Sequence, residues 1–264
     1  MLNRGYYLWR VGGIDSWELT DGNVIDANPG LNAGTAGVQY FFSQLDDVIN
    51  WQYDVSQDGF FNTFRMMFGY PFDLAIEPLI PSPLEQPVMR LPFQDGETWS
   101  FTSGPHGGWD SGSGWAGLDF APPGEETGCV QSDHWVTALA DGLIVRSANG
   151  SVVQDLNGDG YEQTGWVVLY MHIESRERVS QGTFLAAGAK IGHPSCEGGL
   201  SNGTHVHIAR RYNGEWIPAD GPVPYILDDW VSSGTGIEYD GFMQRGDIII
   251  EAYDGNETYN QIYR

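Results

Sequence analysis

The chain has 264 residues, of which 41% are hydrophobic and 13% aromatic, so it can bury a sizeable core and is not intrinsically disordered. Twelve lysines and arginines oppose 35 aspartates and glutamates, which gives a formal net charge of -23. This charge repels phosphate backbones and anionic membrane surfaces, so we expect no nucleic-acid partner. No apolar run approaches the roughly 18 residues that span a bilayer, so we also expect no membrane insertion.

The first third of the chain is predicted to be helical. Between residues 34 and 67, apolar residues recur at three- and four-residue spacing in VQYFFSQLDDVINW and FFNTFRMMF, a pattern typical of two amphipathic helices. Residues 70–92 are rich in proline, which prevents a continuing helix and marks a linker or an extended segment. We therefore predict a helical accessory region with a proline-rich linker over residues 1–90.

The remainder of the chain favours β-structure. Short β-prone runs alternate with glycine, asparagine and aspartate: WVTALA, GLIVRSA, GWVVLYMHI, THVHIARR and, near the C-terminus, DIIIEAY. We predict a mainly β protein, α+β overall, in which an antiparallel β-sheet or sandwich domain spans residues 91–233. A strand-containing tail follows over residues 234–264.

Two cysteines, Cys129 and Cys196, occur without the CxxC spacing of zinc or redox motifs. They are either a disulfide or two free thiols. We favour the disulfide, because each cysteine lies in a glycine-rich loop that flanks the histidine-rich segments. Such a bridge persists only in an oxidising compartment.

All six histidines lie in the β-rich half, at positions 106, 134, 172, 193, 205 and 207. His205 and His207 occupy alternate positions of a strand-like run, so we expect both imidazoles on the same face, roughly 6 to 7 Å apart. One could bind a metal while the other contacts the water on that metal. An isolated HxH is more often an ordinary pair of strand histidines, so the surrounding sequence decides between the two interpretations.

Three ordered segments surround these histidines: PHGGWDSGSGWAGLDFAPP at residues 105–123, LYMHI at 169–173 and SNGTHVHIA at 201–209. Together they resemble the signature segments of the lysostaphin and staphylolysin type zinc endopeptidases. The resemblance covers roughly half of the chain. A long glycine- and tryptophan-rich insert separates His106 from Asp119, whereas most members of that family place these two ligands closer together. The insert is similar to that of the staphylolysin branch.

The resemblance implies a catalytic domain of lysostaphin type that holds one zinc ion. The implied metal ligands are His106, Asp119 and His207. The implied catalytic residues are His172 and His205. Two imidazoles and a carboxylate form the open three-ligand arrangement of catalytic zinc sites, which leaves the fourth position for water.

This arrangement predicts an enzyme, a zinc metalloendopeptidase that hydrolyses peptide bonds with metal-activated water. His205 is placed to accept the proton of that water, and His172 could stabilise the oxyanion or protonate the leaving amine. The sequence does not divide these roles between the two histidines.

The two departures from the family pattern carry separate expectations. The long insert predicts that His106 lies in a loop. Ile208-Ala209 stands where Phe-Glu is common in the family, and it leaves the implied ligands untouched. His134 and His193 match no motif position, so we predict ordinary polar roles for them.

The activity of the family implies peptidoglycan cross-bridges or glycine-rich peptides as substrate. It also implies a secreted or extracytoplasmic location, with the targeting segment outside this chain, because residues 1–21 lack the apolar core of a signal peptide. The acidic composition does not favour electrostatic attraction to an anionic bacterial envelope. The sequence indicates neither an oligomeric state nor a role for the N-terminal region.

Two alternative functions remain open. A catalytically silent wall-binding or regulatory module would keep the same fold, although all five functional positions are occupied here. A serine hydrolase would use Ser201, because residues 199–203 fit GxSxG. The nucleophile elbow needs a strand before it and a helix after it, whereas here a glycine-rich loop precedes and a strand-like run follows.

Asp155, Asn157 and Asp159 repeat the opening of a calcium-binding loop, DxNxDG. The twelfth position of that loop is Trp166 instead of an acidic residue. We interpret the segment as a hairpin turn stabilised by its own side chains. A calcium site that includes Glu162 is the alternative.

Overall fold

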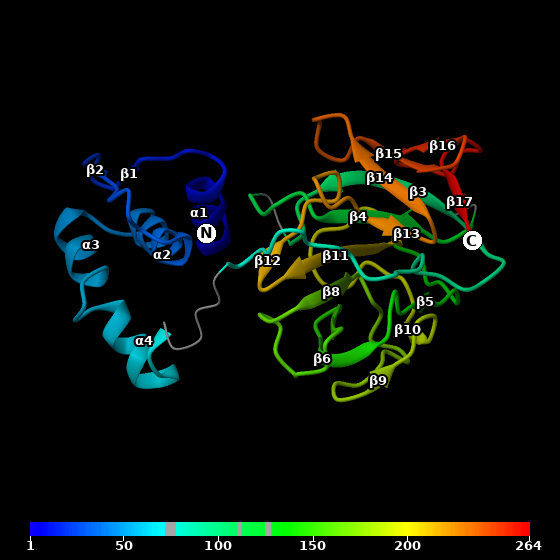
Figure 1. The fold of residues 1–264 in the computed structure, drawn as a ribbon, viewed down its shortest axis with the longest axis horizontal. Coiled ribbons are helices and arrows are strands. Elements are labelled where there is room, and N and C mark those ends of the chain that lie inside the picture. Colours follow the sequence, from blue (N-terminus) through cyan, green and yellow to red (C-terminus); the bar gives the residue numbers. More distant parts are fainter. Residues whose placement is uncertain (72–77, 110–111, 125–127) are drawn as a thin grey trace. The chain divides into compact units, whose positions relative to one another are not determined.

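The computed structural model describes residues 1–71, 78–109, 112–124 and 128–264. They form two compact units, the first from the described residues of 1–77 and 110–113, the second from 78–109 and 114–264. Helices lie in the first unit, and antiparallel strands build the second (Figure 1). This architecture confirms the predicted mainly β fold class. The predicted boundaries near residues 91 and 234 stay predictions.

The first unit packs short helices and a two-stranded hairpin around a small core. Trp17, Leu19, Ala36 and Trp51 are buried there. None of the helices in the described residues is long and apolar enough to cross a membrane. The elements of this unit are α1 (Leu2–Arg10), β1 (Ser16–Glu18), β2 (Val24–Asp26), α2 (Ala33–Ser43), α3 (Val48–Asp54) and α4 (Phe60–Phe68).

The prediction of two helices between residues 34 and 67 is wrong, because α2, α3 and α4 share this stretch. Asp47 is the N-cap of α3, and its carboxylate accepts hydrogen bonds from the backbone N–H groups of Ile49 and Asn50 at 3.1 and 2.9 Å. A capping aspartate starts a new helix, so the run VQYFFSQLDDVINW divides into two. The apolar spacing alone did not reveal this division.

A nine-stranded antiparallel sheet is the main element of the second unit. Its order is β17-β3-β4-β11-β8-β7-β6-β9, and β12 pairs with β11. The strands are β3 (Thr98–His106), β4 (Gly117–Ala121), β6 (Gly142–Ala148), β7 (Ser151–Asp155), β8 (Trp166–Met171), β9 (Phe184–Leu185), β11 (Val206–Tyr212), β12 (Glu215–Trp216) and β17 (Gln261–Tyr263).

Two smaller sheets complete this unit. A four-stranded sheet has the order β13-β14-β15-β16, and β5 pairs with β10. Strands occur in all five β-prone runs of the sequence, whereas β3, β4 and β15 were not predicted. The bounds are β5 (Val136–Thr137), β10 (Lys190–Gly192), β13 (Ile226–Leu227), β14 (Trp230–Gly234), β15 (Gly241–Arg245) and β16 (Ile248–Glu251).

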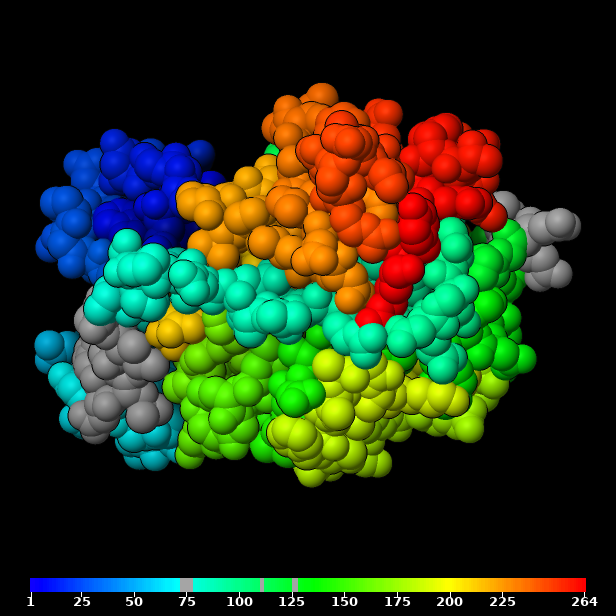
Figure 2. All heavy atoms as spheres, turned by 45° about the vertical axis from the view of Figure 1, so that its right-hand side comes forward, coloured from blue at the N-terminus to red at the C-terminus, as the bar shows by residue number. Residues whose placement is uncertain are grey.

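The segment from residue 78 to 97 runs across the second unit. On the face shown in Figure 2 it lies, in teal, between the C-terminal strands and the strands coloured green to yellow. Gln86 Nε2 donates to the carbonyl of Ile226 at 2.6 Å, and the backbone N–H of Arg90 donates to Leu139 at 2.8 Å. The segment therefore ties the four-stranded sheet to the residues that follow β5.

A disulfide joins Cys129 to Cys196, with their Cα atoms 5.7 Å apart. The predicted bridge is confirmed. It links two loops beside the N-terminal end of β11, and Thr204 adds a second connection, because its backbone N–H donates to the carbonyl of Gly128 at 3.0 Å. Since the bridged residues are 67 positions apart, the bond restricts the unfolded chain strongly.

Replacing both cysteines by serine should lower the free energy of unfolding by about 4 kcal/mol, the value expected for a closed loop of this length. Urea unfolding followed by tryptophan fluorescence measures the loss. Reductant should produce the same loss in the unsubstituted chain and none in the double variant. Equal stability of the oxidised chain and the variant would contradict the prediction.

Candidate metal centre

Three adjacent strands bring the predicted ligands together. His106 is the last residue of β3, Asp119 lies in β4, and His207 lies in β11 directly opposite Asp119 in the strand register. The neighbours of Asp119 in β4, Leu118 and Phe120, are buried in the core. Because successive side chains of a strand alternate between faces, Asp119 points to the opposite face of the sheet.

The prediction that His106 lies in a loop is wrong. β3 continues through Pro105 to His106, and His106 pairs with Gly117 of β4 in the strand register. The insert therefore forms the connection between β3 and β4, and it leaves the ligand itself on a strand. The run TWSFT at the start of β3 is rich in aromatic and β-branched residues, which is the signal that could have indicated this strand.

Three metal-binding atoms converge in this buried group. His207 Nδ1 lies 2.9 Å from Asp119 Oδ1, and His106 Nε2 lies 3.3 Å from the same oxygen. The two imidazole nitrogens are 2.9 Å apart. Each of the three residues is at most 7% exposed. Among the described residues, this is the one group of histidine, cysteine, aspartate and glutamate side chains with the geometry to hold a metal ion.

Backbone carbonyls determine which nitrogen of each ligand faces the group. His106 Nδ1 lies 2.8 Å from the carbonyl of Gly104, and His207 Nε2 lies 3.1 Å from that of Gly108. A carbonyl only accepts hydrogen bonds, so each of these nitrogens carries the proton. The opposite nitrogens then present lone pairs to Asp119. Two lone pairs and a carboxylate that meet at one point need a cation, and they suit zinc.

The pKa shifts of the three residues are consistent with a site for a cation. Burial on its own raises the pKa of Asp119, but the charges of His106 and His205 and the hydrogen bonds of the group hold it well below its ordinary value. Burial lowers the pKa of His207. Burial also acts to lower the pKa of His106, yet the charge and hydrogen bond of Asp119, the carbonyl of Gly104 and the charge of Glu238 together outweigh it and raise that pKa. A metal ion at this point would compete with protons for the ring nitrogens and the carboxylate.

A close approach of the backbone makes room for both imidazoles. A Cβ atom at Gly117 would lie 2.4 Å from His207 Cε1 and 3.2 Å from His106 Nε2. Only glycine fits there. On the outer side, the ring of Tyr239 stacks on the ring of His106, with centroids 4.7 Å apart. The roles of Gly117 and Tyr239 cannot be predicted from the sequence alone, since both depend on which strands and loops meet.

The two predicted catalytic histidines lie beside the ligands. Their ring centroids are 4.4 Å apart, and His205 Nε2 is 3.8 Å from Asp119 Oδ2. His172 directly follows β8 in a left-handed conformation with φ of 62°. Its carbonyl accepts hydrogen bonds from the backbone N–H and the hydroxyl of Ser195 at 2.7 and 2.9 Å, which holds this strained backbone in place.

The loop after Cys196 orients both of these histidines. His172 Nδ1 donates to the carbonyl of Glu197 at 3.0 Å, and His205 Nδ1 donates to that of Gly203 at 2.8 Å. Each neutral ring therefore presents the lone pair of Nε2. Burial, together with the charges of His205 and His207, lowers the pKa of His172 to about 4, so this ring is neutral at pH 7.

The geometry does not favour Ser201 as a nucleophile. Its hydroxyl donates to the carbonyl of Gly203 at 2.7 Å, and it is 3.3 Å from His205 Nδ1. That nitrogen carries a proton, so it is not available as a base. Ser201 lies in a loop that leads into β11, without the helix that follows a nucleophile elbow.

The remaining histidines lie outside the metal-binding group. His134 Nδ1 is 3.1 Å from a carboxylate oxygen of Glu97. His193 Nε2 is 3.0 Å from Glu177, and its Nδ1 donates to the carbonyl of His134 at 2.9 Å. These contacts match the ordinary polar roles predicted for both residues.

The DxNxDG segment, interpreted from the sequence as a hairpin turn with a calcium site as the alternative, uses its carboxylate oxygens within its own turn. Asp155 accepts hydrogen bonds from the backbone N–H groups of Asn157 and Gly160, and Asp159 accepts one from Tyr161. Glu162 points to cations instead, with contacts of 2.8 and 2.9 Å to Arg146 and Arg211. These contacts favour the hairpin turn, and the calcium interpretation has no support.

The buried state of His172 predicts a pH-dependent stability of the metal-free chain. The unfolded imidazole binds a proton near pH 6.5 and the folded one near pH 4, so stability is lost as the pH falls between these values. His172 should contribute a loss of about 3 kcal/mol between pH 7.5 and pH 4. Urea unfolding in the presence of a chelator measures it, with His172→Gln as the control. Parallel pH profiles for both chains would contradict the assignment.

Comparisons with known proteins agree with this geometry. Residues 113–219 match peptidase family M23. The chain is 25% identical over 242 residues to Protease LasA of Pseudomonas aeruginosa, a match that covers 83% of this chain and 54% of that protein. Protease LasA of a second strain is 23% identical over 239 residues, with the same coverage. The chain thus spans about half the length of the curated relatives it matches.

A solved structure extends the comparison to the fold. The M23 metalloprotease pseudoalterin from the deep sea superposes with a TM-score of 0.54 at 23% identity, and the match covers 68% of this chain and 99% of that one. At this identity the likeness concerns the fold alone. Together with the sequence matches, it confirms the resemblance on which the ligand prediction was based: residues 113–219 form a domain of peptidase family M23.

Proposed function

We propose that the second unit is a zinc endopeptidase that hydrolyses peptide bonds in bacterial peptidoglycan cross-bridges or in glycine-rich peptides. In this proposal His106, Asp119 and His207 bind one zinc ion, and His172 and His205 are catalytic. The observation that carries the proposal is the convergence of two imidazole lone pairs and one buried carboxylate within 3.3 Å. The match of residues 113–219 to peptidase family M23 supports the same class of reaction, the hydrolysis of peptide bonds.

The residues present fit the metal, because the two protonated ring nitrogens already have carbonyl acceptors and the remaining donors suit zinc. When bound there, zinc would supply a Lewis acid and would lower the pKa of a bound water to about 7. The chain itself supplies the proton acceptors. His172 and His205 each hold Nδ1–H on a backbone carbonyl, so the Nε2 atom of either ring can accept a proton from the attacking water.

After this transfer, the protonated ring becomes a donor. Its Nε2–H can stabilise the developing oxyanion or protonate the leaving amine. The low pKa of His172 keeps this ring neutral before the reaction. A neighbouring ring at 4.4 Å means that protonation of one histidine disfavours protonation of the other.

We further propose a secreted or extracytoplasmic location. The Cys129–Cys196 disulfide supports it, because such bonds persist in oxidising compartments. The net charge of -23 does not attract an anionic cell wall. In this proposal the substrate is therefore recognised by short-range contacts at the site and not by long-range electrostatic attraction.

Metal content and turnover should separate the roles of the histidines. His207→Ala removes a ligand and should lose zinc, whereas His172→Ala should keep one zinc per chain and lose about 10²- to 10⁴-fold in kcat. Zinc is measured by elemental analysis of the purified variants, and turnover by mass spectrometry of fragments released from cell walls. His193→Gln, outside the group, is the matched control and should keep both.

If His207→Ala and His172→Ala both retain zinc, the ligand assignment is wrong. If the unsubstituted chain binds zinc at this site and releases no fragment from cell walls or glycine-rich peptides, the silent wall-binding or regulatory module replaces the enzyme.

Ser201→Ala should retain kcat within about tenfold, because this hydroxyl only supports the loop that orients His205. A serine nucleophile would lose roughly 10⁶-fold. In the same assay, a chelator should abolish the activity of the unsubstituted chain, and added zinc should restore it. Resistance to the chelator combined with a loss in Ser201→Ala would establish the serine hydrolase.

A further inference from the structure

A cavity of about 610 Å³ adjoins the candidate metal centre. Its lining includes Ala121, which follows Asp119 by two positions in β4 and therefore lies on the same face of the sheet. Ser100 of β3 pairs with Ala121 and also lines the cavity, as does Thr204, the residue directly before His205. The cavity thus continues along the face of β3 and β4 that carries Asp119, although none of the five candidate site residues lines it.

Hydrogen bonds connect the walls of this cavity. Ser100 Oγ donates to Asn256 Oδ1 at 3.1 Å, and Asn256 Nδ2 donates to the carbonyl of Gly124 at 3.3 Å. On the opposite wall, Thr204 Oγ1 accepts from the backbone N–H of Val130 at 2.9 Å. These contacts join strands and loops that are far apart in the sequence, so the cavity is formed before any ligand arrives.

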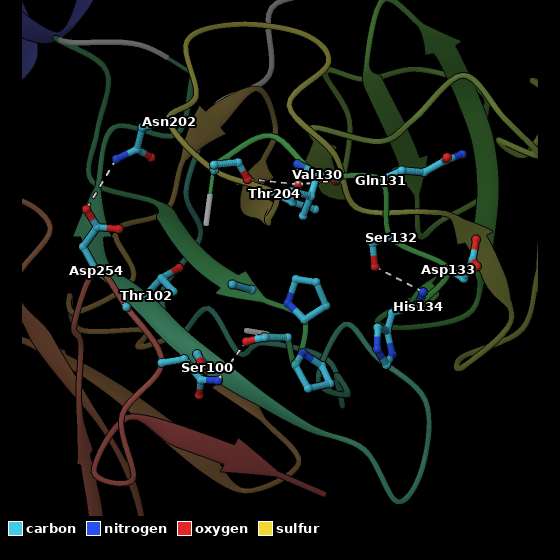
Figure 3. A pocket seen from close by; sticks show the side chains of 18 residues that line it. Ser100, Thr102, Val130, Gln131, Ser132, Asp133, His134, Asn202, Thr204 and Asp254 are labelled. Carbon is cyan, nitrogen blue, oxygen red and sulfur yellow. Dashed lines mark hydrogen bonds between the residues drawn. The ribbon is translucent and has the colours of Figure 1, made fainter. Parts of the chain in front are cut away.

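The lining is small, polar and acidic. Serine, threonine, asparagine, glutamine and glycine predominate, and the described lining residues include neither lysine nor arginine. The lining has two described carboxylates, Asp133 and Asp254, and they differ in their partners. Asp133 forms an ion pair with Arg176 at 2.8 Å, whereas within the described parts of the chain Asp254 accepts only a neutral contact, from Asn202 Nδ2 at 3.4 Å. Figure 3 shows Asn202 and Asp254 on one side of the cavity and Asp133 on the other. Asp254 therefore contributes an uncompensated negative charge.

On the basis of the proposed endopeptidase function, we propose that this cavity binds the part of the substrate chain next to the scissile bond, and that Asp254 selects an ammonium group on it. A carboxylate at the same place meets repulsion, because the described lining contains neither lysine nor arginine, and its one histidine, His134, already contacts Glu97. The polar side chains and glycines leave the peptide backbone room and hydrogen-bonding partners. The selected substrate is thus a chain of small residues that carries a free amine.

Binding of a peptide series tests the proposal without the need for turnover. Glycine peptides with blocked ends carry one lysine, glutamine or glutamate, placed on either side of the central bond. One further peptide has a free terminal amine, which separates side-chain from terminal ammonium groups. Calorimetry at low salt with the zinc-loaded His172→Ala variant keeps the peptides intact. In the better of the two placements, the ammonium peptide should bind about tenfold more tightly than the glutamate peptide, with glutamine between them.

Charge reversal identifies the residue responsible. Asp254→Lys in the same background should invert the preference, and Asp254→Asn should bring the ratio close to one. Asp247→Lys is the matched control, because Asp247 is exposed in the turn between β15 and β16, outside the lining, and the substitution changes the net charge equally. The control should keep the preference for the ammonium peptide.

A ratio within about twofold in the unsubstituted pocket, an equal inversion by Asp247→Lys, or no binding of any peptide would overturn the proposal. The proposed function is tested separately by kcat/KM of the unsubstituted chain on the glutamine peptide. Binding with the predicted preference but without cleavage would refute the endopeptidase and leave the ammonium pocket in place.

Discussion

Two histidine lone pairs and one buried carboxylate meet at a single point of the large sheet, and this constraint organises the second unit. The acceptors repel one another unless a cation lies between them. The strand register enforces the meeting, since His207 lies directly opposite Asp119, and β3 places His106 beside them. The core on the opposite face of β4 and β11 prevents the strands from moving apart, so the sheet maintains the arrangement even before a metal binds.

Backbone carbonyls complete this constraint. Each of the four histidines of the site directs one ring nitrogen to a carbonyl oxygen, which fixes its tautomer and leaves the other nitrogen for chemistry. The accepting carbonyls belong to Gly104, Gly108, Glu197 and Gly203. Two of them follow Cys196 in the chain, so the disulfide supports the loop that orients the catalytic pair. Stability and proposed chemistry therefore depend on the same connections.

Much of this arrangement could be predicted from the sequence. The β-prone runs identified β6, β8, β11 and β16, and the ordered motifs named the three residues whose ligand atoms converge. The orienting carbonyls could not be predicted, because any residue type provides a backbone oxygen. Gly117 and Tyr239 could not be predicted for a related reason, since each contacts one of the histidine ligands from a segment that is distant from that histidine in the sequence. The loop that the long insert predicts at His106 is wrong, because the inserted residues follow β3 and leave its last residue on the strand.

The central claim is that His106, Asp119 and His207 together bind one zinc ion. Crystals of the chain loaded with one equivalent of zinc, measured on both sides of the zinc absorption edge, test it directly. The account predicts a single strong anomalous peak at roughly 2.0 to 2.2 Å from His106 Nε2, Asp119 Oδ1 and His207 Nδ1. A peak at other residues, or zinc-loaded crystals without a peak between these three atoms, would contradict it.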